Sequence, residues 1–288
     1  MADETHSVGR AFAQGVRWSV SRETSSSPMS GGPHLPSTSR GWSMFHVKHS
    51  NDTTPLTIDR VRSMLVAADI SVNDLQIEAL TQHGNSVLRA NSTINLTAVI
   101  EPEDFVRLHI IDSLLPLGMV EGALGAALDM GTGAGYPGIP WAIGGVSMVL
   151  CEATKKKAAL LEQWAREIPV NAEVVSMRAE EYAQVARGRF DTVVARAVSA
   201  LPSLLELSSP LLRVGGQLVA MKGNPSVDEI THAEHAAGVL GMSSTGMMEY
   251  ALPGGGEKRT LCVYEKVEEP SIRLPRRSGL AQRRPFGG

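Results

Sequence analysis

One stretch of the chain decides its fold: Ala127-Leu128-Asp129-Met130-Gly131-Thr132-Gly133-Ala134-Gly135-Tyr136-Pro137-Gly138. An apolar run ends in an acid and then breaks into four closely spaced glycines. Glycine is needed where the backbone takes a positive φ or where a ligand lies against bare peptide, and a helix that follows directs free N–H groups at that ligand. The pattern predicts a strand, a loop that holds a nucleotide-like cofactor, and a helix.

Two cofactor classes compete for this loop, and a turn without a ligand is the third interpretation. Gly133 to Gly138 is a literal G-x-G-x-x-G, which suggests a dinucleotide. In dinucleotide folds, however, the first glycine follows the strand directly and the helix N-terminus faces a pyrophosphate, whereas here Gly131 opens the turn and Pro137 lacks an N–H. Asp129 would also repel a diphosphate, and it suits a cationic ligand. We therefore favour S-adenosylmethionine, a sulfonium that also carries an ammonium group, as the cofactor.

The rest of the chain alternates strands with helices. Strands are predicted at residues 147–152, 172–176, 190–195 and 216–221, and a helix from Lys155 to Arg166. Such alternation predicts an α/β fold with a mostly parallel sheet, whose ligands gather at the carboxyl ends of the strands. Those ends carry Asp129, Glu152, Glu180, Arg196 and Lys222.

A helical block precedes the glycine loop. Residues 59–68 and 72–88 have apolar side chains at helical spacing, and Pro102 opens another helix that continues through Leu114. We expect this block to cap one edge of the sheet. It contains His109 and Asp112, which we interpret as a buried hydrogen-bonded pair in preference to a catalytic dyad.

Composition limits the class of protein. The chain has 288 residues and 43% hydrophobic content, which is enough for a full core, and its apolar runs fall short of the ~20 residues of a membrane span. We expect a soluble, cytoplasmic protein. Residues 1–43 are rich in Ser, Gly and Pro and lack the apolar core of a secretory signal, which predicts a disordered leader. Cys151 and Cys262 fall in predicted strands, so we expect small buried side chains there, with no disulfide and no metal site.

Charge is unevenly placed along the chain. The net charge of −3 argues against general coating of nucleic acid, yet residues 271–288 carry five arginines and no acid. Clustered arginines neutralise phosphates and stack on bases, or else they keep a solvated tail soluble. Combined with a methyl-donor site, the basic tail favours a nucleic-acid substrate.

Six motifs, in order, resemble those of one family, the bacterial small-subunit (16S) ribosomal RNA guanine-N7 methyltransferases, also called glucose-inhibited division protein B. The motifs are Asn95-Leu96-Thr97, His109-Ile110-Ile111-Asp112-Ser113, the glycine loop extended through Ile139-Pro140, Arg178-Ala179-Glu180-Glu181, Ala195-Arg196-Ala197 and Met221-Lys222-Gly223. The resemblance implies a class I S-adenosylmethionine-dependent methyltransferase with a Rossmann-like sheet. We expect a leader (1–43), a helical cap (44–118), the methyltransferase domain (119–267) and a basic tail (268–288).

The resemblance also implies roles for particular residues. Gly131 and Tyr136 would contact the methyl donor, and Ala179 and Glu180 would lie beside its adenine. Arg196 would lie nearby and also belongs to the predicted cofactor site. Lys222 and the tail arginines would lie toward the RNA. From the residues themselves we add Asp129, Gly133 and Gly135 to the cofactor site, and also Glu152, which follows Gly131 at the roughly 20-residue spacing of a ribose ligand.

Three positions depart from the family pattern. Tyr136 stands where Leu or Phe is usual, and Glu152 stands where Asp is usual. Leu108, instead of a basic residue, precedes His109, which leaves the role of Arg107 open.

The expected chemistry needs few polar groups. Guanine N7 carries a free lone pair, so no general base is required, and positioning N7 in line with the methyl group can supply ~7 kcal/mol or more. Arg196 and Lys222 are the catalytic candidates because either can donate to guanine O6, although each can instead form an ion pair at a strand end.

The predicted function is methylation of guanine N7 at one position of small-subunit ribosomal RNA, free or in a ribosomal particle. The alternatives are a small-molecule methyltransferase and a non-catalytic RNA-binding protein with the same fold. The sequence does not specify an oligomeric state, and a monomer is our expectation.

Overall fold

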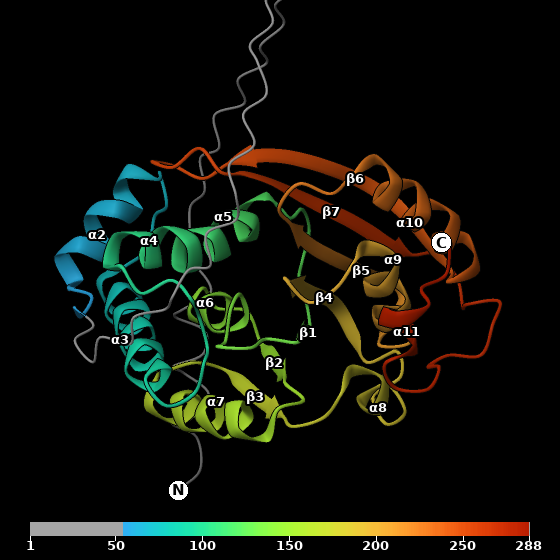
Figure 1. Cartoon of the computed structure of the whole chain (residues 1–288), viewed down its shortest axis with the longest axis horizontal. Helices are drawn as coiled ribbons and strands as arrows, with labels where there is room; N and C mark the ends of the chain where they lie inside the picture. The colour runs from blue at the N-terminus through green and yellow to red at the C-terminus, as the bar shows by residue number, and fades with distance from the viewer. Residues whose placement is uncertain (1–53, 288) are drawn as a thin grey trace, which may run out of the picture.

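The computed structural model describes residues 54–287, which form an α/β domain around one sheet (Figure 1). The described strands form a seven-stranded sheet in the order β3-β2-β1-β4-β5-β7-β6. Their bounds are β1 (Ala127–Met130), β2 (Met148–Cys151), β3 (Ala172–Val175), β4 (Phe190–Arg196), β5 (Leu212–Lys222), β6 (Met242–Ala251) and β7 (Lys258–Lys266). Strands β1 to β5 pair in parallel, and β7 is antiparallel to both β5 and β6. The predicted α/β fold with a mostly parallel, Rossmann-like sheet is confirmed.

Helices cover both faces of the sheet, because successive strand residues point to opposite sides. Ala127 packs into one core cluster, while its neighbours Leu128 and Met130 pack into the other. The first face is covered by α2 (Ile58–Ala67), α3 (Asp74–Asn91), α4 (Pro102–Phe105), the π-helix η1 (Val106–Ile111), α5 (Asp112–Met119), α6 (Gly138–Ile143) and α7 (Lys155–Glu167). The second face is covered by α8 (Ala179–Tyr182), α9 (Leu201–Ser208), α10 (Val227–Val239) and α11 (Leu280–Arg283).

The N-terminal helical block lies on a face of the sheet, so our expectation that it caps an edge is wrong. Its apolar stripe shares one core with α6 and α7. The longest helix of the block, α3, begins with a capping box, in which the Asn73 side chain accepts from the Gln76 N–H and the Gln76 side chain accepts from the Asn73 N–H, each at 2.9 Å. The Gln76 amide then donates to the Ile143 carbonyl at 3.0 Å, which ties the block to the helix that follows the glycine loop.

The chain after β7 folds back onto the second face. We call residues 268–287 the C-terminal segment. Its Leu274 and Ala281 are buried in the same core cluster as α9 and α10. In Figure 1 the short helix α11 of this segment lies beside α9. The basic residues at this end of the chain therefore belong, in part, to the packed domain.

Several expectations from composition can be compared with the described residues. Cys151 and Cys262 are free and buried in β2 and β7, as predicted. Within residues 54–287, no helix is long and apolar enough to cross a membrane, and no cluster of three or more His, Cys, Asp or Glu side chains could hold a metal ion. The predicted disordered leader and the first residues of the predicted cap lie outside the described part of the chain.

Candidate active site

The glycine loop runs from the end of β1 to the start of α6. Gly131, Gly133 and Gly135 all have positive φ, at +74°, +61° and +90°. A Cβ on Gly131 would lie 2.9 Å from a methyl group of Val198, and one on Gly135 would lie 2.6 Å from Ile139. A Cβ on Gly133 would have only a backbone oxygen at 3.9 Å. The first and third glycines are thus required by packing, whereas the second borders space in which a ligand can lie against the backbone.

Asp129 lies beneath this loop. The Gly138 N–H donates to its Oδ2 at 2.7 Å, and its buried Oδ1 has no hydrogen-bond partner among residues 54–287. Burial raises the pKa of Asp129 to about 6, against the opposing effects of the nearby Thr132 hydroxyl and of the Gly138 N–H. Asp129 therefore joins the strand end to the start of α6, and its predicted attraction for a cationic donor remains a prediction.

Glu152, at the end of β2, braces the loop from the neighbouring strand. Its Oε2 accepts from the Gly133 N–H at 3.1 Å, and its Oε1 accepts from the Thr154 N–H at 2.7 Å. Each carboxylate oxygen has a further lone pair, so Glu152 can still accept from two hydroxyls. This geometry is compatible with the predicted ribose contact.

A cavity of about 130 Å³ adjoins the loop, and we call it the glycine-loop cavity. It brings together Gly131, Ala179 and Glu180, three of the predicted cofactor-binding residues. Val198 and Gln282 also line it. Gln282 belongs to the C-terminal segment, and no motif in the sequence indicated it.

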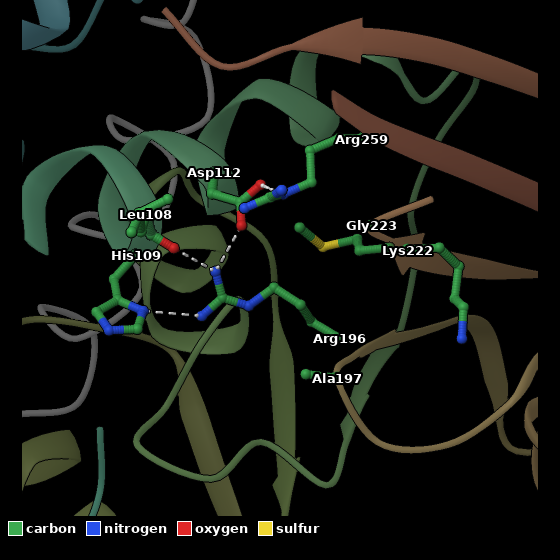
Figure 2. A pocket seen from close by; sticks show the side chains of 9 residues that line it. Leu108, His109, Asp112, Arg196, Ala197, Lys222, Gly223 and Arg259 are labelled. Carbon is green, nitrogen blue, oxygen red and sulfur yellow. Dashed lines mark hydrogen bonds and ion pairs between the residues drawn. The ribbon is translucent and has the colours of Figure 1, made fainter. Parts of the chain in front are cut away.

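A second, larger cavity of about 420 Å³ lies beyond the end of β4, and we call it the arginine cavity (Figure 2). Arg196 and Arg259 lie on either side of Asp112, which accepts from Arg196 at 3.2 Å through Oδ2 and from Arg259 at 3.0 Å through Oδ1. Arg196 also donates to the Leu108 carbonyl of η1 at 3.0 Å. The buried carboxylate thus holds two guanidinium groups at one wall.

His109 and Asp112 each contact Arg196 and other partners, and they do not bond to each other. Our expectation that they form a hydrogen-bonded pair is wrong. His109 Nδ1 lies 3.4 Å from the Arg196 guanidinium, and Nε2 lies 2.7 Å from the Thr97 hydroxyl. Burial, assisted by the charge of Arg196, lowers the pKa of His109 to about 3. The imidazole is therefore neutral near pH 7 and helps to position the arginine.

Tyr136 packs behind the arginine cavity and lies outside the lining of both cavities. Its ring stacks on His109, with 5.1 Å between ring centroids, and also contacts His83 at 4.7 Å. The Arg196 guanidinium lies 5.5 Å from the Tyr136 ring centroid. Tyr136 and the adjacent Gly135 thus support the site from behind, and their contact with a methyl donor remains a prediction.

Lys222, the other catalytic candidate, is engaged in an ion pair. Its ammonium lies 2.8 Å from Glu229 and donates to the Ser199 carbonyl at 2.9 Å. Lys222 lines the arginine cavity, but Figure 2 shows its amine turned away from Arg196. Lys222 is therefore engaged in an ion pair at a strand end, the alternative to a catalytic role. Arg196 also forms an ion pair, with Asp112, but its guanidinium lies within the arginine cavity.

Consecutive residues at the end of β4 line the two cavities. Arg196 and Ala197 line the arginine cavity, and Val198 lines the glycine-loop cavity. Within residues 54–287, the arginine cavity lacks a carboxylate or imidazole poised as a base, because Asp112 is paired with two arginines and His109 is neutral and bonded. This arrangement can position a ligand but does not assist proton removal.

Comparison with known proteins identifies the family. The chain matches the family model for rRNA small subunit methyltransferase G over residues 76–260. It is 41% identical over 209 residues to the ribosomal RNA small subunit methyltransferase G of Deinococcus radiodurans, which covers 70% of this chain and 82% of that protein. The protein of the same name from Rubrobacter xylanophilus is 37% identical over 262 residues, which cover 88% of this chain and 97% of that protein.

Among solved structures, the ribosomal protein L11 methylase of Lactobacillus delbrueckii subsp. bulgaricus aligns with a TM-score of 0.43 and 18% identity, covering 55% of this chain and 79% of that one. The family predicted from the motifs is confirmed by the family model and by the two relatives. This chain belongs to the rRNA small subunit methyltransferase G family.

Proposed function

We propose that this protein transfers a methyl group from S-adenosylmethionine to guanine N7 at one position of small-subunit ribosomal RNA. The observation that carries the proposal is that consecutive residues line the two cavities, Arg196 and Ala197 the arginine cavity and Val198 the glycine-loop cavity. A donor in one cavity and a base in the other would meet at that strand end, and ribosomal RNA is the substrate named for the relatives.

The residues around the glycine loop fit the methyl donor. Gly133 borders open space and Glu152 retains lone pairs for ribose hydroxyls. Gly131, Ala179 and Glu180 line the glycine-loop cavity. We assign these five residues, with Asp129, Gly135 and Tyr136 behind them, to donor binding. When bound, S-adenosylmethionine supplies an electrophilic methyl group on a positively charged sulfur.

Arg196 positions the guanine in this proposal. Its guanidinium can donate to O6, the acceptor beside N7 that arginine favours on guanine. Asp112, His109 and Leu108 hold the guanidinium at 3.0 to 3.4 Å, so little side-chain freedom remains to be lost when the base binds. Because N7 needs no deprotonation, the absence of a poised base among the described residues of the cavity is compatible with the reaction.

The substrate partner is small-subunit ribosomal RNA or the particle that contains it, and we place the enzyme in the cytoplasm as a monomer. Four arginines of the C-terminal segment have exposed side chains that can neutralise phosphates, namely Arg273, Arg277, Arg283 and Arg284. Arg276, in contrast, is partly buried and forms an ion pair with the buried Glu206.

The proposal is tested by methylation of ribosomal RNA and small subunits from a strain that lacks the modification, with labelled donor. N7-methylguanine should appear in the digest, and its absence from both substrates would refute the proposal. Arg196→Lys should lower turnover while donor affinity is retained, because lysine cannot keep the contacts to both Asp112 and Leu108. Lys222→Met, assayed in parallel, decides whether this second candidate contributes to turnover beyond its pairing with Glu229.

Whether RNA is the substrate can be tested by point substitutions in the C-terminal segment. Deleting the segment would disturb the fold, because its Leu274 and Ala281 belong to the core. Replacing Arg273, Arg277 and Arg284 by glutamine should weaken RNA binding and flatten its salt dependence, with donor binding unchanged. A small-molecule methyltransferase would keep full turnover in this variant, and a non-catalytic RNA-binding protein need not bind the donor.

A further inference from the structure

We infer that the C-terminal segment forms one wall of the donor pocket and that Gln282 binds the adenine edge of the methyl donor. The inference rests on the proposed function, which it deepens by adding a residue that selects for adenine. It also assigns a new role to a part of the chain whose arginines alone suggested an RNA-binding tail.

The segment is held to the domain by buried groups. Leu274 and Ala281 are 3% and 1% exposed, which is typical of core residues. The Ser203 hydroxyl of α9 donates to the Ala281 carbonyl at 2.9 Å, and the Arg187 guanidinium donates to the Leu274 carbonyl. These contacts fix the backbone on both sides of the turn at Gly279.

A buried ion pair adds a second anchor. Arg276 donates through Nε to Oε1 of Glu206 at 2.6 Å and through a terminal nitrogen to Oε2. Glu206 is 3% exposed, and a carboxylate buried to that extent is strongly destabilising without its partner. The Arg276 guanidinium also lies 3.9 Å from the centroid of the Phe286 ring, and it donates to the Arg284 carbonyl at 2.8 Å. Arg276 therefore ties both arms of the segment to α9.

A third contact brings the segment to the predicted adenine site. The Gly279 N–H donates to Oε1 of Glu180 at 2.7 Å, and Glu180 lines the glycine-loop cavity. Gly279 has a φ of +77°, a conformation that favours glycine, and it directs the chain into α11. Gln282, three residues later on α11, lines the same cavity.

The chemistry of the cavity suits an adenine ring. Met130, Cys151, Met177 and Val198 offer apolar and sulfur-containing surfaces, which pack favourably against an aromatic face. The Gln282 amide carries both a donor and an acceptor, the pattern that reads the N6 amino group and N7 of adenine together. At the same edge a guanine or hypoxanthine ring presents two acceptors, O6 and N7, which no rotation of one amide can pair with together, so Gln282 would discriminate against it.

Calorimetric titration with S-adenosylhomocysteine tests the inference without relying on turnover. Gln282→Ala should weaken binding by roughly 3- to 10-fold, the range for the loss of one or two ordinary hydrogen bonds. Gln184→Ala, the same substitution at an exposed position outside the lining of both cavities, is the matched control and should leave the affinity unchanged. Urea unfolding of each variant checks that the fold is retained.

Titration with S-inosylhomocysteine gives a readout that a purely structural role would not change. The wild-type protein should prefer the adenine compound, and Gln282→Ala should reduce that preference. Equal affinities of wild type and Gln282→Ala for S-adenosylhomocysteine, or an unchanged preference, would overturn the inference and leave the proposed function standing. A wild-type protein that binds neither compound would refute the proposed function and the inference together.

Arg276 acts in this scheme as a positioning residue, and a double-mutant cycle tests it. Arg276→Ala should also weaken binding of S-adenosylhomocysteine, although Arg276 lies outside the cavity lining. If the Arg276–Glu206 ion pair acts by positioning Gln282, the variant with both Arg276→Ala and Gln282→Ala should lose less binding free energy than the sum of the losses of the two single variants. Full additivity would contradict the positioning role.

Discussion

Replacing Asp129 by Asn should stabilise the protein relative to wild type progressively as the pH rises. Asp129 is fully buried, and burial raises its pKa from 3.8 to about 6. The folded state binds this proton more tightly than the unfolded chain does. The contribution of Asp129 to the free energy of unfolding is therefore greatest below pH 3.8 and is lost as the pH rises through 6. At ~1.4 kcal/mol for each tenfold change in proton affinity, the loss is about 3 kcal/mol.

The substitution isolates this contribution. Asn has no charge to bury, and its side-chain oxygen can still accept from the Gly138 N–H. Any cost of placing the amide nitrogen where Oδ1 lies is independent of pH, so it cancels when the two proteins are compared across a pH series. Because an unfolded Asp is already about half ionised at pH 4, the difference in unfolding free energy between Asn and Asp should grow by about 2 kcal/mol between pH 4 and pH 7.

Urea unfolding followed by tryptophan fluorescence measures this difference, since Trp141 and Trp164 are buried. Asp191→Asn is a control of opposite sign, because the Ala126 N–H and Arg213 lower the pKa of Asp191. That variant should lose stability relative to wild type as the pH rises. A pH-independent difference for Asp129→Asn would show that burial does not disfavour its ionised form and would refute the reasoning.

Three further predictions concern groups near the cavities. Gly131→Ala should destabilise the protein more than Gly133→Ala in urea unfolding. Both variants incur the roughly 1–2 kcal/mol backbone cost of a positive φ, but only the Cβ at position 131 clashes with Val198. Equal losses of unfolding free energy would contradict this. The His83→Leu variant should gain stability relative to wild type as the pH falls from 6.5 to 4, because burial lowers the pKa of His83 to about 4 and protonation of the unfolded chain then opposes folding. If the difference in unfolding free energy between the two proteins does not change with pH, His83 is not a buried neutral imidazole. Asp112→Asn should cost about 3 kcal/mol or more of unfolding free energy and abolish RNA methylation, because two arginines lose their shared carboxylate; retained activity in a methylation assay would count against the site.

The repeating part of the fold is readable from short stretches of sequence. The predicted strand at 190–195 is observed as Phe190–Arg196, and the predicted helix from Lys155 to Arg166 as Lys155–Glu167. Apolar runs for buried parallel strands and the 3.6-residue period of helices are local signals. These local signals suffice to predict the buried strands and helices, because the apolar side chains that produce the pattern lie within the element itself.

The strand β6 was missed because it lacks such a signal. Met242 is buried at its start, but most of the strand is exposed and carries Ser, Thr and Gly. Its stability comes from antiparallel pairing with β7, along nine paired positions. Pairing of this kind depends on a partner elsewhere in the chain and leaves little mark on the strand itself.

The active site divides in the same way. The glycine loop, Glu152 and Arg196 stand out in the sequence because glycines with positive φ and polar residues at strand ends have local causes. Their partners do not stand out, since Arg259 is 147 residues from Asp112 and Gly279 is 99 residues from Glu180. Only the packing of β7 and of the C-terminal segment against the sheet brings these charges and N–H groups together, because hydrogen bonds and ion pairs act over a few ångströms of space regardless of separation along the chain.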